Sequence, residues 1–406
     1  MQHTVQATRQ AGWRQGWILV LAGFLPVVAI IALAPALPTL IGHFSEMSNA
    51  RVMVPLLLTA PSACIALLAP VAGVITDRVG RRRLMLWSMA LYGFGGLVPF
   101  LVDSFWLVVA GRLLIGVAEA GILTVTNTMF ADYFDDKSRR GWLTVQAITG
   151  SGLGSGLLVL SGWLASHGWQ WPFAVYAIAF PLFLGSLFWL YEPERRTPVA
   201  AAAKPEASRT RFPVGTMAAV CAVTLLLSTI YFVQVINFSL VLKELGVDNP
   251  RSIGLISAVP SFGVPIGGLI FHATGRFGSP MQLITTFVFY AVGLAGIGMS
   301  NDVSHAMMFA FVQQLGSGIV VAALIAWAQS KLLFEHRGRG MGLWASSFFV
   351  AQFVSPAVVA AVAHFAGSLR SAFVVFGLLS AVSAAVALLR LWRVRASGTP
   401  SAPARA

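Results

Sequence analysis

Residues 76–83, TDRVGRRR, place one acid and four arginines between two apolar runs, 52–75 and 84–102, that contain no charged residue. This arrangement is typical of a short loop that joins two membrane-spanning helices. The whole chain of 406 residues supports this interpretation, because 57% of its residues are hydrophobic, only 10% are charged and its mean hydropathy is +0.80. Soluble domains carry about 25% charged residues. The sequence therefore predicts an integral membrane protein.

Apolar stretches long enough to cross a membrane, about 20 residues each, recur along the chain. Twelve are predicted, at 17–41, 52–76, 84–102, 105–130, 141–165, 171–191, 212–242, 252–275, 281–300, 305–333, 340–365 and 370–392. The first lies in an uncharged run that is longer than the ~7–15 apolar residues of a signal peptide, so it predicts a retained helix. Residues 192–211, rich in proline and charge, predict an exposed linker. The predicted domains are therefore an N-terminal six-helix bundle (1–191) and a C-terminal six-helix bundle (212–406).

The distribution of basic residues predicts the orientation in the membrane. With twelve helices, the loops and tails on the side of both termini carry 22 lysines and arginines, and those on the other side carry four. Positively charged loops stay in the cytoplasm, so both termini are predicted to be cytoplasmic, in a multi-pass protein of a bacterial inner membrane. The same asymmetry accounts for the net charge of +13 without a nucleic-acid partner.

An internal repeat supports the six-plus-six division. PVAGVITDRVGR (70–81) aligns with PIGGLIFHATGR (265–276) at a constant offset of 195 residues, with His272 in place of Asp77. Duplicated halves that enclose a site near the bilayer midplane are a transporter design.

Three motifs resemble the major facilitator superfamily, and the resemblance covers essentially the whole chain. They are the loop motif (Gly73, Asp77, Arg78, Gly80, Arg81, Arg82, Arg83), RLLIGVAEAG (112–121) and GWQWPFAVYA (168–177). The resemblance implies an all-α membrane fold with twelve helices in two pseudo-symmetric bundles, and it is closest to drug:proton antiporters. It also implies a cytoplasmic gate at Asp77, Arg78, Gly80 and Arg81 that ties the halves together. The alternative is that this loop is only a positively charged anchor.

Glu119 is the one acidic residue that falls well within a predicted helix. Arg112 lies seven residues earlier, two turns away on nearly the same face. Ionisable groups inside a membrane are costly and indicate function. A low-dielectric environment favours a protonated carboxyl group, whereas a neighbouring arginine favours the carboxylate, so Glu119 and Arg112 are candidates for proton coupling. A purely structural Glu–Arg pair is the alternative. Arg112 also matches the family's helix-four arginine, which is linked to proton coupling in antiporters.

The fold that the resemblance implies lines a substrate cavity with predicted helices one, four, seven and ten. Polar and aromatic side chains on or beside these helices are candidate substrate contacts: Phe24, Asn127, Gln146, Tyr231, Gln234, Asn237, Phe238, Gln313, Gln314, Trp327 and Gln352. Each could instead be an interhelical hydrogen bond or ordinary packing. Together they predict an amphipathic site for a bulky, semi-apolar or cationic molecule.

No catalytic motif, metal-ligand spacing or phosphate-binding loop is present, so no enzyme, cofactor or metal is predicted. Pro35 and Pro38 in PALP resemble drug:proton antiporters, although SGLGSG (151–156) lacks the proline of their helix-five motif. We expect a monomer, with protons and a small molecule as its partners in the bilayer, that performs proton-coupled efflux of drug-like compounds or metabolites. The alternative is a proton symporter that takes up an organic acid, sugar or other nutrient.

Overall fold

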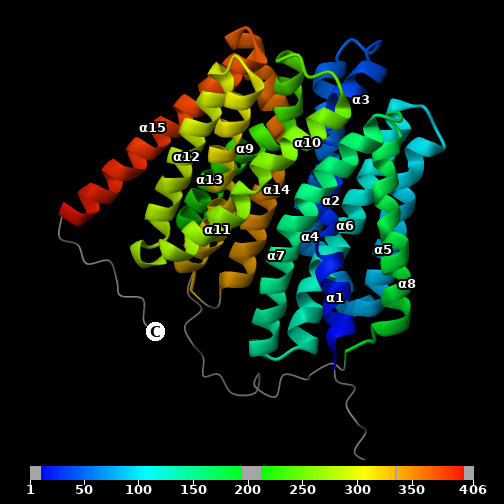
Figure 1. Cartoon of the computed structure of the whole chain (residues 1–406). Helices are drawn as coiled ribbons and strands as arrows, with labels where there is room; N and C mark the ends of the chain where they lie inside the picture. Colours follow the sequence, from blue (N-terminus) through cyan, green and yellow to red (C-terminus); the bar gives the residue numbers. More distant parts are fainter. Residues whose placement is uncertain (1–10, 194–211, 334–335, 397–406) are drawn as a thin grey trace, which may run out of the picture. The chain divides into compact units, whose positions relative to one another are not determined.

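The computed structural model describes residues 11–193, 212–333 and 336–396, in which every regular element is helical (Figure 1). The described α-helices are α1 (Trp13–Ala22), α2 (Leu25–Ile31), α3 (Leu37–His43), α4 (Ala50–Val79), α5 (Arg81–Leu97), α6 (Phe105–Tyr133), α7 (Asp136–Ala165), α8 (Ala179–Trp189), α9 (Val214–Glu244), α10 (Pro250–Ser261), α11 (Gly263–Ala273), α12 (Ser279–Met299), α13 (Val303–Ser330), α14 (Arg337–Ala366) and α15 (Leu369–Ala396). Short 3₁₀ helices follow α5 (Val98–Phe100), precede α8 (Trp171–Ile178) and follow α11 (Gly275–Phe277). The all-helical prediction is confirmed for these residues.

Eleven segments of the described chain are long and apolar enough to cross a membrane. The predicted segment 84–102 is not among them, because its α-helix, α5, has 17 residues. At 1.5 Å per residue, α5 is about 25 Å long, less than the ~30 Å apolar core of a bilayer. A 3₁₀ helix that contains Pro99 continues it. The twelve-helix topology therefore stays a prediction.

The first predicted helix, 17–41, is not continuous, and this part of the prediction was wrong. The chain forms α1, α2 and α3 in succession, with breaks at 23–24 and 32–36. Pro26 and Pro38 lie in the first turns of α2 and α3, and Pro35 lies in the second break. Proline lacks an N–H donor and clashes with the preceding turn inside a helix, whereas a first turn accommodates it. Prolines at these positions therefore favour three short helices.

The chain folds into two compact units. The first comprises Met1–Ile30, Ala60–Leu153 and Phe173–Phe212, and the second comprises Ile31–Thr59, Gly154–Pro172 and Pro213–Ala406. In the first unit α5 packs against α6 and α8; in the second, α12 packs against α13 and α15, and α9 against α14. The predicted linker 192–211 lies outside the described residues from position 194 onward, so the predicted domain boundary stays a prediction.

The second unit contains a close seam between α7 and α10, which come from different halves of the sequence. A Cβ atom on Gly162 would lie 2.8 Å from the Cα of Gly254, and one on Gly254 would lie 2.9 Å from the Cα of Gly162. The Ser155 and Ser261 hydroxyl oxygens are 2.6 Å apart. Small residues allow such close helix packing in membranes. By the predicted topology, the Gly162–Gly254 contact is near the external side of the membrane.

Replacing Gly162 by valine is expected to lower the free energy of unfolding by about 1–3 kcal/mol, the usual cost of overpacking. The new side chain would collide with the α10 backbone. The matched control is Gly152→Val on the same helix, where a Cβ would meet nothing within 4 Å. Thermal unfolding of both purified variants measures the difference, and equal melting temperatures would contradict the packing.

Candidate functional site

Arg112 and Glu119 lie two turns apart on α6, and each side chain is only 1% exposed. The guanidinium group of Arg112 donates one hydrogen bond to the Tyr176 hydroxyl (2.5 Å) and another to the Ala29 carbonyl (2.8 Å). The Tyr176 hydroxyl in turn donates to the same carbonyl (2.9 Å). Arg112 and Tyr176 therefore hold α2 just before the second break in the first predicted helix.

Near Glu119, α6 packs closely against α4. One turn earlier, a Cβ on Gly116 would be 2.7 Å from the Cα of Pro61 and 2.8 Å from the Cβ of Cys64. The Cys64 thiol and the Tyr92 phenol lie within electrostatic range of the Glu119 carboxyl group. The Tyr92 hydroxyl donates a hydrogen bond to the Leu25 carbonyl of α2 (2.8 Å), so its proton is not available to Glu119.

One oxygen of Glu119, Oε1, is buried and has no hydrogen-bond partner in the described part of the chain. A buried acceptor without a partner is expensive, by about 1–3 kcal/mol and more for a charged group. Binding a proton removes the charge of the carboxyl group and hence much of that cost. The geometry therefore suits a carboxyl group that gains and loses a proton.

The candidate substrate contacts in the first unit occupy different surroundings. The Gln146 side chain of α7 packs over Gly23, and the Phe24 ring lies against Gly150, where an added Cβ would be 3.7 Å from it. Phe24 and Gln146 thus meet at the first break of the first predicted helix. Asn127 on α6 is exposed.

The candidates in the second unit are distributed over α9, α13 and α14. Gln234, Asn237, Phe238, Gln313 and Gln352 are buried, whereas Tyr231, Gln314 and Trp327 are partly exposed.

Several polar atoms among these candidates lack partners in the described residues. Gln234 donates to the Ala310 carbonyl (3.3 Å), but its Oε1 has no hydrogen-bond partner there, and neither has Nε2 of Gln313. Asn237 donates to the Val233 carbonyl of its own helix (2.9 Å). Gln313 packs against Gly293 of α12. Whether any of these side chains binds substrate stays a prediction. No cluster of three metal-ligating side chains occurs within the described ranges.

The loop at residues 76–83 is held in place by two acidic residues, Glu192 and Asp132, which the sequence did not assign to it. Gly80 has φ of +96°, a conformation that favours glycine, and precedes α5. The Glu192 carboxylate accepts hydrogen bonds from the backbone N–H groups of Arg81 (2.7 Å) and Arg82 (2.9 Å). The Arg81 guanidinium forms an ion pair with Asp132 at the end of α6 (2.8 Å).

Among the predicted gate residues, Gly80 and Arg81 therefore lie in a network of contacts within the first unit. Arg78 lies in the last turn of α4, Gly80 directly precedes α5, and Arg81 is the first residue of α5. The side chain of Asp77 lies outside the described part of the structure, so the latch between the halves stays a prediction. The available signal for Glu192 was a carboxylate directly after the predicted segment 171–191, but the sequence analysis placed it in the linker.

Replacing Glu192 by glutamine is expected to lower the free energy of unfolding by about 1 kcal/mol, the usual cost of losing a helix N-cap. The carboxylate accepts from two backbone donors and offsets the helix dipole of α5. Thermal unfolding of the purified variant is the measurement. Glu46→Gln, at an exposed acid, is the control, and an equally small effect at both positions would contradict the capping role.

The family model of the Major Facilitator Superfamily matches residues 19–272 and 220–406. The bacillibactin exporter of Bacillus subtilis is 27% identical over 157 residues (37% of this chain, 39% of that protein). The class H tetracycline resistance protein of Pasteurella multocida is 25% identical over 193 residues (47% of each chain). The chain therefore spans less than half the length of these curated relatives.

A solved structure of a D-xylose–proton symporter is similar over 92% of this chain and 97% of its own, with a TM-score of 0.74 at 16% identity. At that identity the likeness indicates the fold alone.

Proposed function

Because the chain belongs to the Major Facilitator Superfamily, we propose that it is a proton-coupled exporter of small, semi-apolar organic molecules. The family consists of membrane transporters, not enzymes. In this proposal, twelve helices cross a bacterial inner membrane with both termini in the cytoplasm. The halves 1–191 and 212–406 alternate about a central substrate site, and the protein acts as a monomer.

The observation that carries the proton coupling is the Glu119 carboxyl group, buried with an unpartnered oxygen two turns from Arg112. When Glu119 loses its proton, its negative charge attracts the guanidinium group through a low-dielectric interior, where charge interactions are strong. That attraction competes with the hydrogen bonds from Arg112 to Tyr176 and Ala29. Loss of the Glu119 proton is therefore expected to weaken the hydrogen bonds by which Arg112 holds α2, and gain of the proton to restore them.

Two observations favour export of semi-apolar molecules over uptake of nutrients. The candidate contacts are neutral amides and aromatic rings, which suit semi-apolar or cationic compounds better than anions. Relatives named for export and drug resistance match parts of the chain. The second candidate function is a proton symporter for an organic acid, sugar or other nutrient, which the GVAEAG motif around Glu119 favours.

Direction of transport is tested by expressing the chain in a bacterium that lacks its own efflux pumps. Growth is measured against tetracycline, ethidium and tetraphenylphosphonium. Protection relative to the empty vector is expected for an exporter. Greater sensitivity would indicate uptake and would support the second candidate, whereas unchanged growth with every compound would rule out a broad drug exporter.

A further inference from the structure

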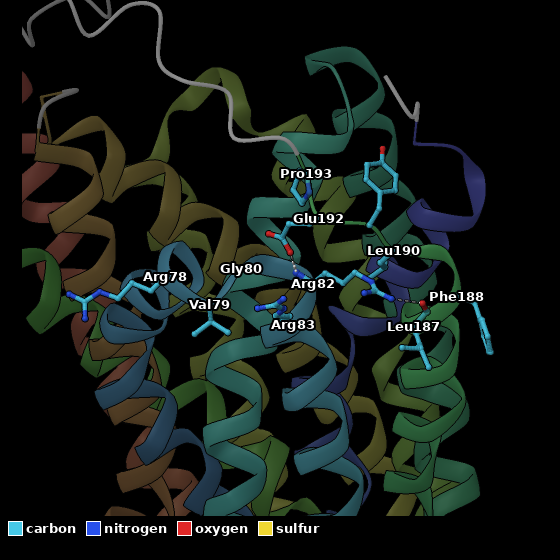
Figure 2. A pocket seen from close by; sticks show the side chains of 11 residues that line it. Arg78, Val79, Gly80, Arg82, Arg83, Leu187, Phe188, Leu190, Glu192 and Pro193 are labelled. Atoms are coloured by element: carbon cyan, nitrogen blue, oxygen red, sulfur yellow. Dashed lines mark hydrogen bonds between the residues drawn. The ribbon is translucent and has the colours of Figure 1, made fainter. Parts of the chain in front are cut away.

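A cavity of about 600 Å³ lies in the first unit, between the end of α4, the start of α5 and the end of α8. Figure 2 shows the residues that line it, among them Arg78, Arg82, Arg83 and Glu192. Its volume is within the ~300–1,000 Å³ range of small-molecule sites. It is separate from the Glu119–Arg112 site, which is buried in α6.

The charge of the cavity is positive. Three arginines and one glutamate are among its lining residues, and the glutamate, Glu192, already accepts from two backbone N–H groups of α5. Arg82 directs one guanidinium nitrogen to the Leu187 carbonyl (2.7 Å), while its Nε is buried without a hydrogen-bond partner in the described residues. Arg83 is exposed. The cavity therefore suits an anion that can accept several charge-assisted hydrogen bonds.

The wall formed by α8 is apolar. Leu187 and Phe188 line it and are 38% and 75% exposed. They lie in the last turn of a candidate membrane span, Trp171–Trp189, on the side that the basic residues predict to be cytoplasmic. In Figure 2 they lie on the α8 side, beyond the guanidinium group of Arg82. Positive charge beside exposed apolar side chains at the end of a span matches the two parts of a phospholipid, a phosphate headgroup and an acyl chain.

We propose that this cavity binds the phosphate headgroup of an anionic phospholipid of the inner leaflet, with Arg82 and Arg83 on the phosphate and Phe188 beside the acyl chain. A soluble phosphate compound could make the same contacts with the arginines, but it has no acyl chain to pack against the apolar wall of α8. Basic pockets between membrane helices on the cytoplasmic side are places where anionic headgroups bind. The proposal is independent of the transported substrate.

The test uses the full-length protein, purified in detergent and freed of native lipid. Binding of dioctanoyl phosphatidylglycerol, dioctanoyl phosphatidylcholine and glycerol 3-phosphate is measured by native mass spectrometry. Phosphatidylglycerol is expected to bind at least about 10-fold more tightly than phosphatidylcholine. Arg83→Gln is expected to weaken phosphatidylglycerol binding about 10-fold, the loss of one charge-assisted contact. Arg339→Gln, at an exposed arginine of α14, is the matched control and should leave binding unchanged.

The variant Phe188→Ala distinguishes binding of a lipid from binding of a soluble anion. It also provides an independent test if the Arg83 variant fails to fold. It is expected to weaken phosphatidylglycerol and to leave glycerol 3-phosphate unaffected. Equal affinity for the two lipids, or equal binding by the Arg83 and Arg339 variants, would overturn the proposal. So would glycerol 3-phosphate binding as tightly as phosphatidylglycerol with no effect of Phe188→Ala, because the site would then belong to a soluble phosphate compound.

Discussion

Glu119→Gln is expected to reduce protection against the transported compounds to the level of the empty vector while leaving the protein folded. Glutamine keeps the shape of the side chain and its hydrogen-bonding capacity but cannot release a proton. The position is 1% exposed and its Oε1 lacks a partner in the described residues, so a neutral side chain is accommodated there at little cost. Growth of the efflux-deficient bacterium, at equal membrane expression of both proteins, is the measurement.

Two controls distinguish lost coupling from a general defect. Glu119→Asp retains a titratable carboxyl group and is expected to keep part of the protection. Exchange of labelled for unlabelled substrate across a vesicle membrane needs no net proton movement, so Glu119→Gln should still perform it. Full protection by Glu119→Gln would contradict a coupling role for this residue.

Arg112→Ala is expected to have the largest effect on stability, a loss of about 3–5 kcal/mol in the free energy of unfolding. That is the usual cost of removing one partner of a buried charged network. The substitution takes away both hydrogen bonds to Tyr176 and Ala29 and leaves Glu119 without its neighbouring positive charge. We expect low membrane expression, a lower melting temperature and no transport.

Arg251→Ala is the matched control, because Arg251 is exposed at the start of α10 and the hydrogen bond recorded there uses its backbone N–H group. Exposed substitutions usually change stability by less than about 0.5 kcal/mol. Tyr176→Phe removes only the hydroxyl group between Arg112 and the Ala29 carbonyl, and should cost about 1 kcal/mol. A melting temperature for Arg112→Ala equal to that of Arg251→Ala would show that the guanidinium network does not support the fold.

The membrane class and the family could be predicted from the sequence because they depend on local features. A basic loop between uncharged runs can be recognised from the sequence alone. The family that this loop indicated is confirmed. The breaks in the first predicted helix were missed for a physical reason. Prolines such as Pro26, Pro35 and Pro38 are often tolerated inside membrane helices, where neighbouring groups satisfy the freed backbone. Their presence alone does not say whether the helix continues.

The partners of the candidate site depend on packing between distant segments. Arg112 contacts Ala29 and Tyr176, which are 83 and 64 residues away in the sequence. Helical spacing along α6 could identify Glu119 as a neighbour of Arg112, but it could not identify these distant partners. The sequence also could not show which face of α6 points to a substrate cavity, so Asn127, which is exposed on α6, stays a prediction as a substrate contact. A helix that is apolar on all sides gives no periodic signal for its inward face.

The central claim, proton-coupled export through Glu119, is tested most directly by proton movement in everted membrane vesicles. Respiration acidifies their interior and quenches an acridine dye, and a compound against which the wild type protects cells is then added. The account predicts rapid recovery of fluorescence with the wild type, as protons leave in exchange for the entering compound, and none with Glu119→Gln. Protection of cells without any recovery in wild-type vesicles would contradict proton coupling, and equal recovery in the variant would place the coupling elsewhere.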